Sequence, residues 1–380
     1  MRWIKEVVRF AGLSVLLVAQ SAIGQDETAR IESRCSGPGP FALRVDPDLL
    51  RGDARIEEIE ELPLSKTVGR TPGLEMLAQR GVCQDPGTGR TVFERHVHLP
   101  ALRSLPLQDG STGGVEEEAF PGEFRPPGDL PGPLVVIGSD QRVIQSPTTA
   151  FPFRAVVKLV MTYQNDPNTP KIKFGCTGSF IGGFHILTAG HCVYKQPTGQ
   201  FLNVFGWADS VLVIPALDGT TKPFGQTFVS KPLRSFKSWT DDADTEGDIG
   251  LITLDQTFTV GSFGLLYPGD GTLDSTTAQI IGYPGDRGSP AGTQQAFVPG
   301  GGAITDHDSE VVYYQIDTFK GQSGSGVYRF WNGKRVIIAV HHGGPCSSAP
   351  ENCGARITKY RHDVIRGWQC ADGQSISGLC

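Results

Sequence analysis

Gly321-Gln322-Ser323-Gly324-Ser325-Gly326 is the stretch from which this chain can be interpreted. Gly321 and Gly324 have no Cβ atom, so the backbone can turn sharply and direct its amide groups toward one point. A serine in such a turn suits a nucleophile whose own N–H, together with that of Gly321, stabilises an oxyanion. A flexible Gly/Ser loop has the same composition, so the prediction requires a base and an orienting acid elsewhere.

The chain around this loop, from residue 135 onward, consists mainly of short strand-like runs. Clusters of Gly, Pro, Asn and Asp separate β-branched and aromatic segments at 156–161, 178–188, 201–205, 210–214, 249–254, 279–281, 311–316 and 336–340. This pattern predicts an all-β fold, either a barrel or a sandwich. A C-terminal helix is the exception, because Ile357, Tyr360, Val364, Ile365 and Trp368 share one face at helical spacing.

The overall composition is that of a folded, mildly acidic protein. The chain has 380 residues and a formal net charge of −6, with 49 glycines and 27 prolines. This length allows one large or two modest domains, and the glycine and proline content favours turn-dense β architecture. A nucleic-acid partner is not expected, since it would require a basic patch.

The first 24 residues have the pattern of a signal peptide. Arg2, Lys5 and Arg9 precede an apolar run at 10–19, and small residues follow at 21–24. The run is too short to span a bilayer, so we expect cleavage near Gly24 or Ala22 and a secreted protein without a membrane anchor. A buried N-terminal helix is the alternative interpretation.

Residues 25–134 differ in composition from the remainder of the chain. The part up to 103 is charged and mixed, and residues 103–134 are rich in Pro, Gly and acidic side chains, which indicates an exposed linker. A linker after a signal and a small segment predicts a propeptide that is cut away and acts as a partner of the mature domain. A stable N-terminal domain of unrelated purpose is the alternative.

Eight cysteines are compatible with disulfides in an exported protein. Pairing of sequence neighbours is preferred, although spacing alone leaves many other connectivities open. No C-x-x-C motif occurs, so structural zinc is not expected, and we predict no metal and no cofactor. The preferred pairs are Cys35 with Cys83, Cys176 with Cys192, Cys346 with Cys353, and Cys370 with Cys380.

The base and the acid that Ser323 requires can both be found. His191 follows an apolar strand in Leu187-Thr188-Ala189-Gly190-His191-Cys192, beside a cysteine that can fix the turn to Cys176. Asp248 begins the apolar strand of Gly247-Asp248-Ile249-Gly250-Leu251-Ile252, where a buried carboxylate needs a hydrogen-bonded partner. His191, Asp248 and Ser323 are therefore the candidate catalytic residues.

The order of these motifs (TAGHC, GDIGLI and GQSGSG) resembles the chymotrypsin-fold serine peptidases. The chain is more similar still to the bacterial glutamyl endopeptidases of the staphylococcal V8 and Bacillus type, from about Val135 to Trp368. Residues 136–142, 281–286, 291–294, 317–318 and 355–358 match that group as well. The resemblance implies a double antiparallel β-barrel with a C-terminal helix at residues 135–380, a trypsin-like serine protease domain.

The resemblance also implies roles for individual residues. His191 would be the general base, Asp248 its orienting carboxylate and Ser323 the nucleophile, with the amides of Gly321 and Ser323 as oxyanion hole. Thr318 and His341 would contact the carboxylate of a P1 glutamate, and the amine of Val135, or of Val136, would assist after propeptide removal. The implied protein is a secreted monomeric zymogen that cleaves peptides after Glu and less readily after Asp.

The sequence departs from the family pattern in three places, and two alternative functions remain open. Lys320 replaces a glycine of the Bacillus enzymes, Gly326 replaces a proline, and the tail from Cys370 to Cys380 lies beyond the resemblance. We assign no acidic residue to the trypsin-like pocket base, which favours Glu specificity. The same triad with another P1 preference, or a catalytically inactive binding module on the scaffold, are the alternatives.

Overall fold

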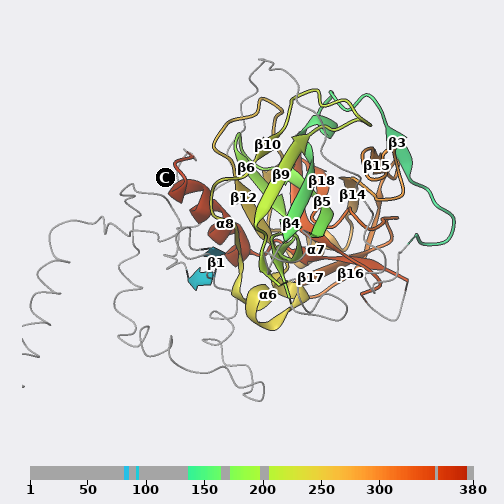
Figure 1. Cartoon of the computed structure of the whole chain (residues 1–380). Helices are drawn as coiled ribbons and strands as arrows, with labels where there is room; N and C mark the ends of the chain where they lie inside the picture. Colours follow the sequence, from blue (N-terminus) through green and yellow to red (C-terminus); the bar gives the residue numbers. More distant parts are fainter. Residues whose placement is uncertain are drawn as a thin grey trace, which may run out of the picture.

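The computed structural model describes residues 81–84, 91–93, 136–163, 172–196, 205–346 and 350–374. Two nine-stranded sheets make up most of this part of the chain (Figure 1). The all-β prediction with a C-terminal helix is confirmed. The predicted signal peptide and the linker at 103–134 lie outside the described residues, as do Val135, Cys35 and Cys380.

The first sheet contains the strands of the N-terminal barrel. Its order is β10-β9-β4-β5-β6-β12-β11-β1-β2. Long strands β4 and β5 pair antiparallel along eight positions, and Val157, Leu159 and Met161 of β4 are completely buried. The strands of this sheet are β1 Gly81–Gln84, β2 Thr91–Phe93, β4 Val156–Tyr163, β5 Ile172–Phe180, β6 His185–Thr188, β9 Ser210–Pro215, β10 Thr227–Phe228, β11 Arg234–Phe236 and β12 Gly250–Thr253.

The predicted run 178–188 is two strands rather than one. Residues 181–184 form a turn between β5 and β6, and the Ile181 amide donates to the His185 carbonyl oxygen at 3.0 Å. Apolar side chains alone do not mark this turn, because Ile181 is itself in the core, with 1% of its surface exposed. Gly182 and Gly183 are the local signal for it.

The second sheet closes on itself. Strand β14 pairs with β16 on one side and with β18 on the other, so β14, β16, β17, β20, β19 and β18 form a ring. Strands β15, β3 and β13 extend it. The bounds are β3 Val143–Gln145, β13 Gly264–Leu265, β14 Thr277–Gly282, β15 Gln295–Phe297, β16 Gly302–His307, β17 Val311–Tyr314, β18 Gly326–Trp331, β19 Lys334–Gly343 and β20 Asn352–Arg356.

Within the described ranges, every helix except the C-terminal one is short. The remaining described elements are two paired two-residue strands and five helical turns: β7 Tyr194–Lys195, β8 Gly206–Trp207, α5 Gly190–Val193, α6 Lys237–Asp242, α7 Asp270–Leu273, η1 Phe153–Ala155 and η3 Thr245–Gly247. The predicted helix is α8, Lys359–Ala371, and Val364, Ile365 and Trp368 on its inner face are buried. No helix among the described residues is long and apolar enough to cross a bilayer.

Helix α8 is attached to the first barrel by an ionic contact at its end. Asp372 accepts hydrogen bonds from both terminal nitrogens of Arg234 at 2.8 Å and from Thr253 Oγ1 at 2.7 Å, and its Oδ2 lies 3.0 Å from His185 Nε2. The helix therefore lies beside β6, β11 and β12, where Figure 1 shows it in dark red.

One part of the predicted propeptide belongs to the first sheet. β1 pairs antiparallel with β11, and β2 pairs with β1 on its outer side. Val82 and Cys83 are completely buried, and Val82 is a member of the main hydrophobic core. β1 was not predicted from the sequence, because only its pairing with β11 makes it part of the sheet.

Candidate active site

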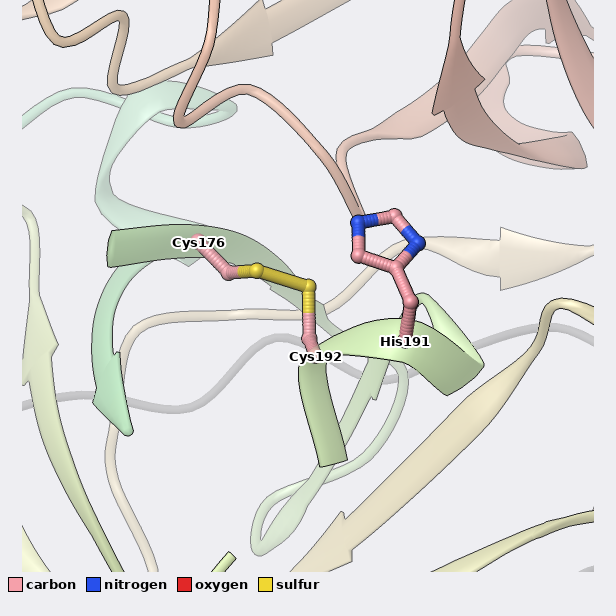
Figure 2. Close-up of side chains that lie close together, drawn as sticks. All are labelled: Cys176, His191 and Cys192. Carbon is pink, nitrogen blue, oxygen red and sulfur yellow. A yellow bond between two sulfur atoms is a disulfide. The ribbon is translucent and has the colours of Figure 1, made fainter. Parts of the chain in front are cut away.

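The candidate base lies on a turn held by a disulfide. His191 belongs to α5, which follows the buried strand β6, and its side chain is 17% exposed. The predicted bridge between Cys176 and Cys192 joins β5 to this turn, with the ring of His191 beside it (Figure 2). Gly190 allows close packing here, since a Cβ would lie 2.8 Å from Trp239. The turn that carries His191 is thus held by the disulfide on one side and by Trp239 on the other.

The other cysteines follow the predicted pattern as far as the structure describes them. Cys346 and Cys353 are bridged, as predicted. Cys83 and Cys370 are also disulfide-bonded. The predicted pairs with Cys35 and Cys380 therefore remain predictions.

The candidate acid is completely enclosed by the protein. Asp248 has no exposed surface, and it lies between η3 and β12. Its Oδ1 accepts the backbone N–H of His191 at 2.7 Å, and its Oδ2 lies 2.8 Å from Nδ1 of the same residue. The carboxylate thus fixes both the position of the backbone and the orientation of the ring, with Nδ1 as donor.

The electrostatics of the pair follow from this enclosure. Burial alone would raise the pKa of Asp248, but the nearby His191 and His342 and their hydrogen bonds hold it well below its usual range. Burial lowers the pKa of His191, and Lys195 and His342 lower it further, against the opposing effect of Asp248. The acid is therefore ionised and the imidazole neutral at neutral pH, which is the state a general base requires.

The serine loop has the sharp turn expected from its glycines. Gly321 has a φ of +99° and Gly324 a φ of +85°. A Cβ on Gly321 would lie 2.6 Å from the carbonyl oxygen of Tyr283, so only glycine fits. Ser325 is completely buried and belongs to the framework of the loop, whereas Ser323 is partly exposed.

The amides of this loop divide into two groups. The N–H groups of Gln322, Gly324 and Ser325 donate to backbone carbonyl oxygens at 2.9–3.0 Å. The N–H groups of Gly321 and Ser323 have no acceptor among the described residues. Two unpaired donors beside a partly exposed serine hydroxyl are what an oxyanion hole needs. The Ser323 hydroxyl itself donates to the carbonyl oxygen of His342 at 3.3 Å.

The residues predicted to read the P1 side chain are buried. Thr318 is 3% exposed and His341 is 2% exposed. Nδ1 of His341 lies 2.7 Å from the hydroxyl of Tyr314, which in turn donates to the Cys353 carbonyl oxygen at 2.8 Å. Burial, with smaller effects of His342 and His191, lowers the pKa of His341 to about 3, so the ring is neutral. No hydrogen bond joins Thr318 to His341.

One acidic residue contradicts an expectation from the sequence. Asp317 stands at the same spacing from Ser323 as the specificity aspartate of trypsin from its serine, so the statement that no acid occupies this position is wrong. Asp317 is 5% exposed. Its two oxygens accept the backbone N–H groups of Ile137 at 2.7 Å and Gln141 at 2.8 Å. The carboxylate therefore anchors the segment that follows Val135 and is already hydrogen-bonded.

A second histidine shares the candidate acid. Nδ1 of His342 lies 2.5 Å from Asp248 Oδ2, the same oxygen that faces Nδ1 of His191. The two imidazole rings meet edge to face, with centroids 5.5 Å apart. Although burial lowers the pKa of His342, Asp248 raises it above the ordinary value. No role was predicted for His342, which follows the predicted pocket residue His341 directly.

In the part of the chain that the structure describes, two groups of side chains lie close enough together to hold a metal ion. Cys176, His191 and Cys192 form one, but both sulfurs are joined in the disulfide and cannot act as thiolates. His191, Asp248 and His342 form the other, with N–O separations of 2.8 and 2.5 Å. These are hydrogen-bond lengths, whereas tetrahedral zinc holds its ligand atoms roughly 3.3 Å apart. The second cluster fits shared protons rather than a metal ion.

Comparison with known proteins agrees with this geometry. Residues 144–363 match the family model Trypsin. A Glutamyl endopeptidase of Bacillus licheniformis is 34% identical over 68% of this chain and 77% of its own. A protein of Bacillus subtilis called Extracellular metalloprotease is 33% identical over 62% of this chain and 70% of its own.

A solved structure supports the same assignment. The structure of a Glu endopeptidase in complex with MPD matches with a TM-score of 0.50 at 27% identity, and the match covers 63% of this chain and all of that one. The family match extends over more than half of the chain, and the ring of six strands, the buried acid and the serine turn fit it. The chain belongs to the trypsin family, and it is a serine endopeptidase with the chymotrypsin fold.

Proposed function

We propose that this endopeptidase is secreted as a zymogen and cleaves peptide bonds after glutamate, less readily after aspartate, with His191, Asp248 and Ser323 as its triad. The observation that carries the proposal is the Asp248 carboxylate, which holds His191 by its backbone and its ring at 2.7 and 2.8 Å. Because Nδ1 of His191 faces the carboxylate, its Nε2 is the nitrogen that can accept the hydroxyl proton of Ser323 when a substrate is bound.

The chemical steps then follow from the positions of these groups. Ser323 Oγ turns from the His342 carbonyl oxygen toward His191, transfers its proton to Nε2 and bonds to the substrate carbonyl carbon. The N–H groups of Gly321 and Ser323 stabilise the resulting oxyanion. His191 gives the proton to the leaving amine, and an acyl-enzyme forms. In the second half of the reaction, water loses a proton to His191 and attacks the acyl-enzyme, which releases the acid product and returns the proton to Ser323.

The preference for glutamate rests on His341 and on its contact with Tyr314. Tyr314 has a single hydroxyl proton, which can go either to the Cys353 carbonyl oxygen or to Nδ1 of His341. If Tyr314 donates to His341, the neutral ring carries its proton on Nε2 and can donate to a P1 carboxylate. A bound carboxylate favours this tautomer and also opposes the loss of charge that burial causes. Thr318 would add a hydroxyl donor.

The activation step is supported by the anchoring of the mature N-terminal segment. Ile137 and Gln141 donate to Asp317, which immediately precedes Thr318. Val135 lies two residues before Ile137, and two residues span at most about 7 Å. Cleavage before Val135 or Val136 would therefore create a cationic amine within reach of the pocket wall, where it can attract the substrate acid.

Secretion is supported by the pattern of the first 24 residues and by the similarity to a Bacillus subtilis protein named Extracellular metalloprotease. The natural test is N-terminal sequencing of the protein from the culture medium. A mature chain that begins at Val135 or Val136 is the expected result.

Substrates that differ only at P1 test the specificity. Peptides with Glu, Asp, Phe or Arg at P1 should be cleaved in the order Glu, Asp, then the other two, and Ser323→Ala should reduce every rate by several orders of magnitude. His341→Ala should remove the preference for Glu, whereas His307→Ala, a surface control that contacts Asp274, should not. A preference for Phe or Arg would refute the pocket assignment while leaving the triad intact.

A form with one or two extra residues before Val135 tests the activation step. It should be nearly inactive toward Glu substrates, although it should still react with a serine-directed organophosphate at Ser323. Full activity of the extended form would refute the role of the new amine.

A further inference from the structure

The hairpin formed by β1 and β2 lies in the region that activation would separate from the protease domain. β1 nevertheless continues the first sheet, with Gly81 opposite Phe236, Val82 opposite Ser235 and Cys83 opposite Arg234. It is therefore attached to the domain by main-chain pairing and not only by side-chain contacts.

The buried side chains of β1 give this pairing its strength. Val82 and Cys83 have no exposed surface, and Val82 shares the core with Phe236 and Leu251. Removal of β1 would expose apolar surface of this core to water. It would also leave β11 as an edge strand whose outer N–H and C=O groups have lost their partners.

The hairpin also lies next to elements that position the candidate base. β11 is followed directly by α6, which contacts β1 and carries Trp239. The ring of Trp239 lies 5.9 Å from that of His191. On its other side β11 pairs with β12, and Ser235 Oγ donates to the Ile249 carbonyl oxygen at 2.9 Å, next to Asp248.

We propose that strands β1 and β2 stay bound to the protease domain after activation, so that the mature enzyme consists of two chains. The proposal rests on the activation cleavage before Val135 or Val136. The edge of β11 that would be exposed without β1 is thus covered by a segment of the same chain. The retained hairpin completes the first barrel and supports the turn that carries Trp239.

The decisive experiment starts from the full chain with a tag at residue 25 and a site for a sequence-specific processing protease that ends at residue 134. After cleavage, the tagged fragment is captured under native, non-reducing conditions. The protease domain should be captured with it in equal amount, and urea with a reductant should separate the two. A fragment that leaves the wild-type domain immediately after cleavage would overturn the proposal.

A matched pair of variants tests whether β1 provides the attachment. Val82→Asp places a charge in the core and should reduce co-capture at least tenfold. Phe228→Asp is the control, because Phe228 is 60% exposed on β10 at the opposite end of the same sheet. Co-capture that is equal in both variants would refute attachment through β1.

Hydrogen exchange on the cleaved wild-type protein provides a test that does not depend on the folding of a variant. The amides of β11 that face β1 should remain protected as long as the fragment is bound and lose protection when it is removed, whereas those that face β12 should stay protected. Exchange that is unchanged by removal of the fragment would contradict the proposed pairing.

The same samples separate this inference from the proposed function. If the fragment leaves the domain on its own after cleavage and the domain then cleaves P1 Glu substrates, the proposed function is supported and the retention of β1 is overturned. Co-capture with no activity toward P1 Glu would support the inference and overturn the proposed specificity or activation.

Discussion

Replacement of His342 tests how one buried carboxylate serves two imidazole rings. Asparagine at this position retains a side-chain N–H close to where Nδ1 donates to Asp248, but it cannot take up a proton. Alanine removes both the donor and the charge. We expect His342→Asn to move the acid limb of the kcat/KM profile to higher pH, and His342→Ala to lower kcat as well.

The direction follows from the order in which the two rings take up protons. The pKa of His342 is raised above the ordinary histidine value, whereas the pKa of His191 is lowered. As the pH falls, His342 is therefore protonated first, and His191 must accept its proton beside an existing cation. Other charges facing this pair are Asp248, which favours both protonations, and Lys195, which opposes that of His191; the neighbouring His341 is neutral. Loss of the His342 charge raises the pKa of His191.

The size of the shift can be worked out from the separation of the rings. Two unit charges 5.5 Å apart repel each other by about 3 kcal/mol at an effective dielectric constant near 20, and by ~0.8 kcal/mol in bulk water. The side chains of His191 and His342 are 17% and 30% exposed, so the value lies between these limits. Since one pH unit corresponds to about 1.4 kcal/mol, we expect the acid limb to move by about one unit.

The loss of the donor has a separate effect on the rate. A buried carboxylate that loses one hydrogen bond is destabilised by roughly 1–3 kcal/mol, so kcat of His342→Ala should fall about tenfold or more. His342→Asn should recover most of this loss. The assay is kcat and KM for one Glu substrate from pH 4 to 9, with circular dichroism to verify folding. An acid limb at the same pH in wild type and His342→Asn would refute the electrostatic reasoning.

Two further substitutions test the framework of the site. Gly321→Ala should reduce kcat about a hundredfold with little change in KM, because its Cβ would meet the Tyr283 carbonyl oxygen at 2.6 Å and displace an oxyanion donor; an unchanged kcat would contradict this. Asp372→Asn should destabilise the fold by roughly 3 kcal/mol in urea unfolding, since it leaves the buried Arg234 without its counter-charge. The pKa of Asp372 is lowered, despite burial, by its bonds to His185 and Arg234, so its contribution is present above pH ~4 and should disappear as the pH falls toward the folded-state value.

The sequence predicted those features that depend on local chemistry. The glycines around Ser323 indicated a sharp turn, and both turn glycines have positive φ angles. Asp248 was selected among several acidic neighbours because an apolar strand follows it, and it is the one without exposed surface. Helical spacing of apolar residues predicted α8 correctly.

Features that depend on pairing between distant segments could not be predicted in this way. β1 is four residues long, and only its register against β11 makes it part of the core. The contact of His342 with Asp248 joins residues 94 positions apart in the sequence. The position of Asp317 could have been read from its spacing to Ser323, but its hydrogen bonds to Ile137 and Gln141 join it to a segment about 180 positions away in the sequence.

The hydrogen-bonded state of Asp317 has a consequence for the choice of inhibitors. Amidine and guanidine compounds bind trypsin-like pockets through a free carboxylate at the pocket base. Asp317 has the corresponding spacing from Ser323, and both of its oxygens already accept backbone N–H groups at 2.7 and 2.8 Å. A cationic inhibitor would have to displace the segment 137–141 before it could form its ion pair. Acidic or neutral warheads are therefore the better starting point for selective inhibition, and a benzamidine column should not retain the enzyme.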